Sequence, residues 1–323
     1  MKMNLTKMSM LMMMIMSTMM ILSSNNMLFS WMSMEINLIV FMPLITKSKK
    51  MTDQSMKYFI VQSLSSSMML MSMLINSTIE YPINSSIMLM TSMLMKTGMI
   101  PFHLWMISMM QSMTWENCLL FSTWQKIAPT IMMSQIMSMK SMMLPMILSL
   151  LYAPISAMKQ LSTKKIMAYS SISNSTWMIL SAMMSKMMFM MFMWLYSMLN
   201  MILMKTFKMK NIMFINQMNK MNTKNSKMSM IMNMMSISGM PPLAGFFPKW
   251  MILQTMSSIS MTMSTSMIIS SMMSTFIYMK MTSIIVMESS TKKKSLKKEK
   301  MLIETSITLN MLGMPAFLIL KSI

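Results

Sequence analysis

Apolar runs of about 17 to 25 residues recur along nearly the whole chain, and they restrict its fold more than any other feature. A helix of that length crosses roughly 30 Å of hydrocarbon. With 54% hydrophobic residues, 11% charged residues and a mean hydropathy of +0.53, the chain is too apolar for a soluble globular core. The runs are continuously apolar, whereas a membrane β-barrel needs strands that alternate apolar and polar residues. The sequence therefore predicts an all-α, polytopic membrane protein.

The runs predict about eleven transmembrane helices in one membrane domain that covers residues 1–323. The first run lacks a small-residue cleavage site and is followed at once by another, so we do not expect it to be a cleaved signal peptide. Basic loops are expected at about 207–227 and 288–300. The spans are expected at about 8–24, 27–46, 56–75, 85–110, 118–138, 141–160, 165–184, 187–206, 228–253, 257–279 and 301–320.

The lysines predict the orientation of the chain. When the connections are placed alternately on two sides of the membrane, most lysines fall on the N-terminal side, and the other side holds only Lys140, Lys186 and Lys321. Because basic residues stay on the side from which insertion begins, we expect the N-terminus inside and the C-terminus outside, which are the matrix and the intermembrane space if the protein is mitochondrial. The net charge of +21 lies in short loops, which favours anionic phospholipid such as cardiolipin, not nucleic acid, as its partner.

The composition indicates an organellar gene. The chain has 72 methionines, four glycines and no arginine. An A+T-rich gene read with a mitochondrial code in which AUA encodes Met would show this skew, which is a hypothesis tested by finding the gene in organelle DNA. Methionine also fills irregular gaps between helices. Cys118 is the only cysteine, so an intramolecular disulfide and a CxxC metal or iron–sulfur site are excluded.

Two of the predicted spans contain helix breakers beside a lysine. In the span at about 85–110, Lys96 is followed by Gly98 and Pro101, and it lies too deep to reach either surface easily. A packing kink with a snorkelling lysine is the alternative to a polar cavity there. The span at about 228–253 has a denser set of breakers before Lys249, which lies nearer a span end and can also snorkel. The breakers in this second span are Gly239, Pro241, Pro242, Gly245 and Pro248.

Two further charged residues, Glu35 and Lys126, lie near the middle of apolar spans. A charged side chain at the centre of a membrane helix costs roughly 2.5–3.5 kcal/mol, so four of them cost on the order of 10 kcal/mol when unpaired. They must be paired, hydrated or neutralised, and a purely structural ion pair would also meet that need. Burial disfavours the charged forms and proximity of opposite charges favours them, so protonation responds to small changes nearby. Such groups can relay protons.

His103 is the only histidine and follows the first break, where it can either join a proton relay or serve as a hydrogen-bonding partner between helices. It has no neighbouring ligand residues that would make a metal site. The sequence contains no dinucleotide-binding or phosphate-binding glycine loop, no serine triad and no carboxylate cluster. Nucleotide binding and hydrolysis by this chain are therefore not supported.

Five segments that occur between residues 31 and 250 resemble, in order, the mitochondrial NADH dehydrogenase subunit 2 family. They are WMSMEINLIVFMPLI, LMKTGMIPFHLW, WQKIAP, KKIMAYSSIS and GMPPLAGFFPKW. The resemblance implies an antiporter-like fold and a place in the membrane arm of respiratory complex I, the NADH:ubiquinone oxidoreductase of the inner mitochondrial membrane. It also implies that other subunits bind NADH, FMN, the iron–sulfur clusters and ubiquinone, so this chain is enzymatic only as a subunit and needs no cofactor or metal.

The resemblance also assigns roles to the buried charges. Glu35 and Lys96 match the family's acid and lysine pair, Lys126 its central lysine, and Lys249 the lysine beyond the second break. The implied mechanism is a relay in which Glu35 stabilises protonated Lys96 and a proton moves toward Lys126 and then Lys249, coupled to electron transfer elsewhere. The chain departs from the family at Asn174 and Thr176, where a histidine and a glycine are frequent, although Asn174 can still hold a water.

Two other functions use the same features. A stand-alone cation/proton antiporter would need no electron-transfer partners, but such relatives commonly have about fourteen spans. A non-conducting scaffold would only space neighbouring subunits, and replacing its buried charges would harm assembly without changing coupling. No repeat of clear sequence identity is visible, although the compositional bias would mask a weak one.

Overall fold

The computed structural model describes residues 5–46, 49–78, 82–220, 224–287, 304–308 and 310. Over these residues the protein is all-helical apart from an isolated antiparallel bridge between Ser162 and Phe214. The chain gathers into two compact units, Met1–Met146 and Ile147–Ile323. Helix α8 (Met139–Met158) runs through the boundary between them in the sequence. The prediction of an all-helical membrane fold is confirmed.

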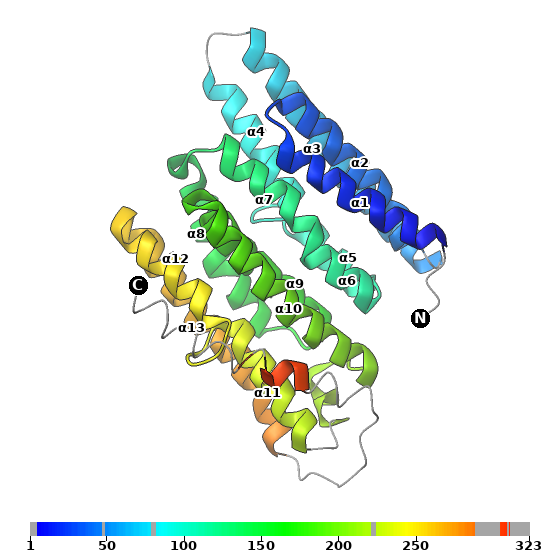
Figure 1. The fold of residues 1–323 in the computed structure, drawn as a ribbon, viewed down its shortest axis with the longest axis vertical. Coiled ribbons are helices and arrows are strands. Elements are labelled where there is room, and N and C mark those ends of the chain that lie inside the picture. Colours follow the sequence, from blue (N-terminus) through cyan, green and yellow to red (C-terminus); the bar gives the residue numbers. More distant parts are fainter. Residues whose placement is uncertain are drawn as a thin grey trace. The chain divides into compact units, whose positions relative to one another are not determined.

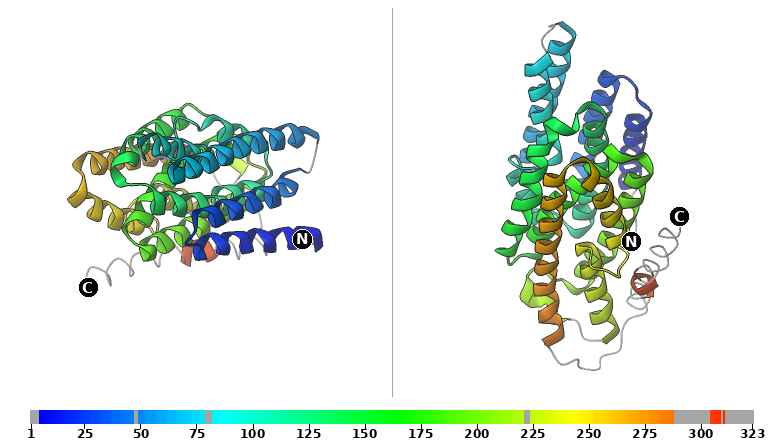
Figure 2. Two further views of the ribbon diagram at one scale, coloured as in Figure 1. Left: turned by 90° about the horizontal axis from the view of Figure 1, so that it is seen from above. Right: turned by 90° about the vertical axis from the view of Figure 1, so that its left-hand side faces the viewer.

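The first unit contains seven described helices besides the start of α8. Helix α2 packs between α1 and α3, α3 also packs against α4 and α5, and α7 packs against α1 and α4 (Figure 1). Figure 2 shows α3 and α4 side by side from two further directions. The bounds are α1 Leu5–Ser23, α2 Met27–Ile45, α3 Lys49–Thr78, α4 Pro82–Thr97, α5 Leu104–Ser112, α6 Trp115–Ser122 and α7 Trp124–Ile136.

In the second unit, α10 packs against α9, α11 and α12, and α13 covers α11 and α12. A short 3₁₀ helix, η1, follows α10, whose end is closed by Asn211 in the left-handed conformation at φ 50°. The bounds are α9 Thr163–Met184, α10 Lys186–Lys210, η1 Ile215–Lys220, α11 Lys224–Ser238, α12 Phe246–Ile259 and α13 Met261–Met287.

The many serines in these apolar helices bond to their own helix backbone. Ser65, Ser171 and Ser266, for example, each donate to the carbonyl three residues earlier, at 2.7–2.8 Å. A hydroxyl bonded in this way has no need of water or of a neighbouring helix. The scattered polar residues therefore do not prevent the runs from forming membrane helices.

Six described helices are long and apolar enough to cross a membrane, judged by length and composition. They correspond to the predicted spans at about 8–24, 27–46, 56–75, 141–160, 187–206 and 257–279. The two spans that carry the helix breakers are divided, into α4 with α5 and into α11 with α12. The last predicted span lies largely outside the described residues, as does the basic loop at 288–300, so the number of eleven spans remains a prediction.

One expectation needs correction. The span predicted at 118–138 is not one continuous helix, because it kinks at Thr123 between α6 and α7. The Thr123 hydroxyl donates to the Leu119 carbonyl at 2.7 Å, and bonding of this kind often bends helices. Pro129 follows within α7.

Candidate functional site

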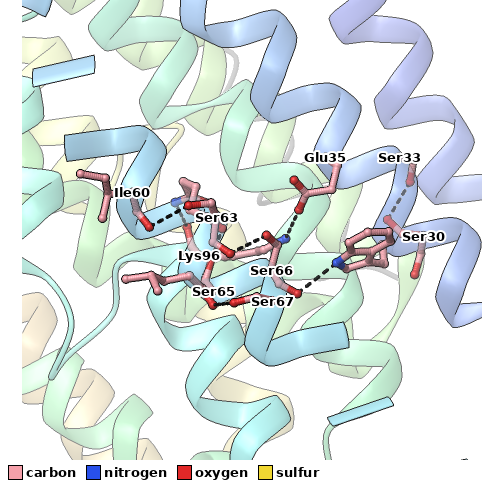
Figure 3. Close-up of polar contacts among 12 residues, drawn as sticks. Ser30, Ser33, Glu35, Ile60, Ser63, Ser65, Ser66, Ser67 and Lys96 are labelled. Carbon is pink, nitrogen blue, oxygen red and sulfur yellow. Dashed lines mark hydrogen bonds and ion pairs between the residues drawn. The ribbon is translucent and has the colours of Figure 1, made fainter. Parts of the chain in front are cut away.

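Glu35 and Lys96 meet inside the first unit. Glu35 projects from α2 and Lys96 from the last turn of α4, and they point toward each other (Figure 3). The Lys96 Nζ lies 3.8 Å from Glu35 Oε1, with the lysine side chain 6% and the glutamate side chain 25% exposed. Glu35 Oε1 is buried and has no hydrogen-bond partner among the described residues. The contact is thus an ion pair held by charge, without a direct hydrogen bond.

The first helix break begins directly after Lys96. Helix α4 ends at Thr97, and Gly98 has φ +68°, a left-handed conformation that favours glycine. The peptide bond between Ile100 and Pro101 is cis, and α5 starts at Leu104. Because α4 stops here, the Thr97 carbonyl has no backbone N–H from a following helical turn to bond.

Lys126 uses that carbonyl. Its Nζ donates to the Thr97 oxygen and lies 3.3 Å from the sulfur of Met106. The side chain is 4% exposed, and it stands one turn after the kink at Thr123. Lys126 therefore reaches the end of α4, where it bonds the carbonyl of the residue that follows Lys96.

A small cavity of about 40 Å³ borders both lysines. This volume is room for about two or three water molecules. Its wall combines apolar side chains with several polar groups that a water can bond. The polar or aromatic residues of the wall are Asn37, Tyr58, Gln62, Lys96, Thr97, Trp105, Phe121, Gln125 and Lys126.

Uncharged polar residues of this wall were missed at the level of sequence. Asn37 and Gln125 exchange two hydrogen bonds of 3.1 Å, and Gln62 donates to the Lys96 carbonyl at 3.4 Å. The ring of Tyr58 contacts those of Trp105 and Phe121. Asn37, Gln62 and Gln125 could have been found in the sequence as amide side chains inside apolar spans, because an amide at membrane depth needs a hydrogen-bond partner.

The second break holds Lys249. Helix α11 ends at Ser238, Gly239 has φ +88°, and α12 starts at Phe246 after a cis bond between Pro241 and Pro242. The Lys249 Nζ donates to the carbonyls of Ile237 and Ser238 at 3.0 and 2.9 Å and lies 5.8 Å from the centre of the Trp177 ring. The side chain is thus turned into the break, and at 8% exposure it does not snorkel to the protein surface.

The two breaks share one local design. Gly98–Pro101 and Gly239–Pro242 have the same Gly-Met-x-Pro order, the same left-handed glycine and the same cis bond before the final proline. In each, a lysine amine from a later helix bonds the carbonyl of the residue before the glycine, Thr97 or Ser238. A repeat of four residues is too short to stand out in a sequence with this composition.

His103 lies within the first break. It precedes α5, is 7% exposed, and its Nδ1 lies 3.2 Å from the Pro101 carbonyl oxygen. It borders neither the cavity beside Lys96 nor the one beside Lys249. Its part in a relay and its part as a hydrogen-bonding partner between helices both stay predictions. The described residues include no group of three His, Cys, Asp or Glu that would hold a metal.

A family model described as NADH:quinone oxidoreductase/Mrp antiporter, TM matches residues 24–277. NADH-ubiquinone oxidoreductase chain 2 of Locusta migratoria is 33% identical over 262 residues, which are 76% of this chain and 75% of the relative. The same protein of Balaenoptera musculus is 32% identical over 284 residues, or 83% and 82% of the two chains. That of Anopheles gambiae is 29% identical over 261 residues, or 77% and 76%.

Solved structures share the fold. A chain of respiratory complex I from Thermus thermophilus superimposes with a TM-score of 0.84 at 17% identity, covering 97% of this chain and 78% of that one. A chain of the Mrp complex from Dietzia gives a TM-score of 0.71 at 14% identity, covering 89% and 62%. The antiporter-like fold expected from the resemblance is confirmed.

Proposed function

This chain belongs to the NADH:quinone oxidoreductase/Mrp antiporter family, and from that premise we propose that it conducts protons across a membrane through its buried glutamate and lysines. One observation carries the proposal: Lys96 and Lys126 border the same small cavity, and the Lys126 amine bonds the carbonyl of Thr97, the residue after Lys96. A purely structural ion pair needs neither the second lysine nor the cavity.

The chain is an antiporter-like membrane subunit of respiratory complex I, since its homologues are NADH-ubiquinone oxidoreductase chain 2 and its fold is that of complex I membrane subunits. Its homologues are mitochondrial, which implies the mitochondrion as its location. We place it in the inner membrane as a single multi-pass domain of eleven spans, beside other membrane-arm subunits and phospholipid, cardiolipin included. The N-terminus faces the matrix, and NADH, FMN, iron–sulfur clusters and ubiquinone bind other subunits.

In the first unit, Glu35 favours the ammonium form of Lys96 because the opposite charge lies 3.8 Å away. When that pairing weakens, Lys96 releases a proton through water in the cavity, and Lys126 accepts it. Lys126 is suited to this exchange because a carbonyl oxygen accepts a hydrogen bond from either –NH₃⁺ or –NH₂. Its bond to Thr97 therefore persists in both protonation states.

Lys249 is the corresponding carrier in the second unit. It too is held by backbone carbonyls, so it exchanges a proton without losing its anchor. A change in the charge on one lysine alters the protonation of the next, since charges at membrane depth are weakly screened. In this way the relay responds to electron transfer in other subunits.

Replacing Lys126 with methionine tests the function. Lys126→Met keeps the length and bulk of the side chain but removes the proton carrier, so we expect the complex to assemble and to move fewer protons per NADH oxidised. The measurement is proton uptake or release by purified complex in sealed vesicles, divided by NADH consumption. Lys140→Met is the matched control, because Lys140 is exposed at the start of α8. Undiminished stoichiometry in assembled Lys126→Met would overturn the proposal.

The similarity to the Mrp complex keeps a stand-alone cation/proton antiporter as the second candidate. Native mass spectrometry separates the two, because the antiporter would be isolated without NADH-oxidising subunits. A scaffold role predicts a third result, in which Lys126→Met lowers assembly and leaves the stoichiometry of the remaining complex unchanged.

A further inference from the structure

Two amide side chains, Asn37 and Gln125, join α2 to α7 beside the first cavity, and we call them the amide pair. Asn37 Nδ2 donates to Gln125 Oε1, and Gln125 Nε2 donates to Asn37 Oδ1, both at 3.1 Å. Asn37 is 4% exposed, and Gln125 Nε2 also lies 3.4 Å from the sulfur of Met14 on α1. Both amides border the cavity of about 40 Å³ that Lys96 and Lys126 share.

The amide pair lies at the depth of a buried charge on each of its helices. Asn37 follows Glu35 by two residues on α2, and Gln125 directly precedes Lys126 on α7. At a rise of about 1.5 Å per residue, these offsets are about 3 Å and about 1.5 Å along the helix axes. Residues one or two positions apart do not face each other on a helix, and Asn37 accordingly borders the cavity whereas Glu35 does not. Any effect of the amide pair on the charges is therefore transmitted through the helices.

A reciprocal amide pair fixes how two helices are aligned along their axes. If α7 slid by one residue, about 1.5 Å, both bonds would leave the normal range of about 2.7–3.2 Å unless the side chains changed rotamer. An apolar pair imposes no such alignment, because its contacts are non-directional. A bond of 2.7 Å from Asn117 to the Leu44 carbonyl ties α2 to α6, which precedes the kink at Thr123. The amide pair ties α2 to α7, which follows the kink.

We propose that the amide pair positions Lys126 by locking α7 to α2, so that a displacement of the helix that carries Glu35 is passed to the Lys126 amine. The proposal deepens the proposed function and rests on it, because it names what links the ion pair of Glu35 and Lys96 to the next lysine. Lys126 bonds the Thr97 carbonyl of α4, so a shift of α7 relative to α4 changes that bond. The two amides carry no charge and exchange no proton in this role, and they are positioning residues.

Leucine substitutions separate positioning from simple filling of space. Asn37→Leu or Gln125→Leu alone leaves the other amide without its partner, so we expect less assembled complex. The double variant leaves no unpaired amide, and its assembly should return close to normal. Its pumping per assembled complex should nevertheless stay at least about tenfold below normal, since misplacing a reacting group by about 1 Å can slow transfer about a hundredfold. The measurement is NADH-driven proton uptake by sealed vesicles, divided by the amount of complex on native gels.

An exchange of the two amides provides a rescue. Gln125→Asn alone shortens one side chain by a methylene, so it should break both bonds and slow pumping. Adding Asn37→Gln restores the combined length of the two side chains, so both bonds can form again and pumping should recover. This comparison holds even if the leucine variants fail to assemble. Equal pumping by the single and the exchanged variant would contradict the proposal.

A buried amide bond of the second unit is the matched control. Asn310 Nδ2 donates to Asn233 Oδ1 at 2.9 Å, and neither residue borders the cavity beside Lys126 or the one beside Lys249. Asn310→Leu should lower assembly without changing pumping per assembled complex. If Lys126→Met lowers pumping while the double leucine variant pumps normally, the proposed function stands and the positioning role is refuted. Normal pumping in Lys126→Met would refute the proposed function itself, and the positioning role with it.

Discussion

The buried charges of this chain have two kinds of partner. Lys96 faces a carboxylate, whereas Lys126 and Lys249 face backbone carbonyls. A carboxylate stabilises the ammonium form and makes its deprotonation depend on the distance between the two groups. A carbonyl satisfies hydrogen bonds without neutralising the charge. The first arrangement suits a site whose state is controlled by a neighbour, and the second suits a site that passes a proton on.

Removing the Glu35 carboxylate should therefore cost more stability than removing the carboxylate of a more exposed ion pair. Glu35→Gln leaves Lys96 buried and uncompensated, and we expect a loss of about 3 kcal/mol, the lower end of the range for breaking buried pairs because Glu35 is partly exposed. The measurement is the thermal midpoint for release of this subunit from purified complex, together with protons pumped per NADH.

The control is the pair of Lys7 and Glu116, whose atoms are 3.2 Å apart and whose side chains are 25% and 29% exposed. Glu116→Gln should cost only about 0.2–1 kcal/mol and should leave pumping unchanged. Equal effects of Glu35→Gln and Glu116→Gln would contradict a special role for the buried pair.

At the scale of elements, three interrupted helices determine which backbone carbonyls the lysine amines can bond. A continuous helix uses its own carbonyls, so an amine can bond carbonyls such as those of Thr97 and Ser238 only where the helix ends. The kink at Thr123 comes one turn before Lys126 and sets the direction in which α7 carries it. Each lysine thus depends on an interruption in its own or in a neighbouring helix.

The kink at Thr123 can be tested without changing side-chain shape. Thr123→Val removes the bond to the Leu119 carbonyl, so α6 and α7 should straighten and move the Lys126 amine away from Thr97. We expect reduced pumping and a stability loss of about 1 kcal/mol. Thr282→Val removes a hydroxyl-to-backbone bond of 2.9 Å within α13, away from the buried lysines, and should change stability alone. Pumping at the normal rate in Thr123→Val would count against the role of the kink.

Two glycines of the second break should respond differently to alanine. A Cβ at Gly245 would lie 1.8 Å from the Ser236 carbonyl oxygen, which is backbone and cannot move aside, so Gly245→Ala should prevent normal assembly. At Gly239 the nearest atom, at 2.9 Å, is Cδ of the flexible Lys249 side chain, and φ is +88°.

Gly239→Ala should therefore allow assembly at a cost of about 1–3 kcal/mol while displacing Lys249 and lowering pumping. Native gels of membranes carrying each variant measure assembly, and vesicle assays measure pumping. Better assembly of Gly245→Ala than of Gly239→Ala would contradict the geometry of the break.

At the scale of the whole molecule, each compact unit carries one copy of the same device, a left-handed glycine break whose last carbonyl holds a lysine. The two copies give each unit a lysine, Lys126 or Lys249, that can bind and release a proton. A proton relay needs a fixed orientation in the membrane, which we propose the lysine-rich connections supply.

Thiol labelling can measure this orientation, because Cys118 is buried and gives a low background. Met187 lies in the first turn of α10 and Met213 follows its other end, and they are 74% and 42% exposed. An impermeant thiol reagent should label Met213→Cys only from the matrix side and Met187→Cys only from the intermembrane side, with labelling after denaturation as the control. The reverse pattern would invert the proposed topology.

Much of the fold follows from the sequence alone. Continuous apolar runs require helices because a lipid environment offers no other partners for the backbone, and Gly98, Pro101 and Gly239 mark where two of them break. The family can be identified from five short segments of the sequence. The four charges within apolar runs, Glu35 among them, can also be identified, because charged residues at membrane depth are rare. The kink at Thr123 escaped prediction because a hydroxyl bends a helix only when its rotamer directs it to the backbone.

What each lysine faces was decided only by the tertiary structure. The sequence determined that Lys96, Lys126 and Lys249 lie within apolar runs, since hydropathy is a property of neighbours along the chain, but it left snorkelling open for Lys96 and Lys249. It did not determine that Lys126 bonds the end of α4, or that Asn174, Tyr196 and Lys249 share a cavity, since these groups come from separate helices. Their distances depend on how the helices pack, and packing is set by contacts between residues far apart in the sequence.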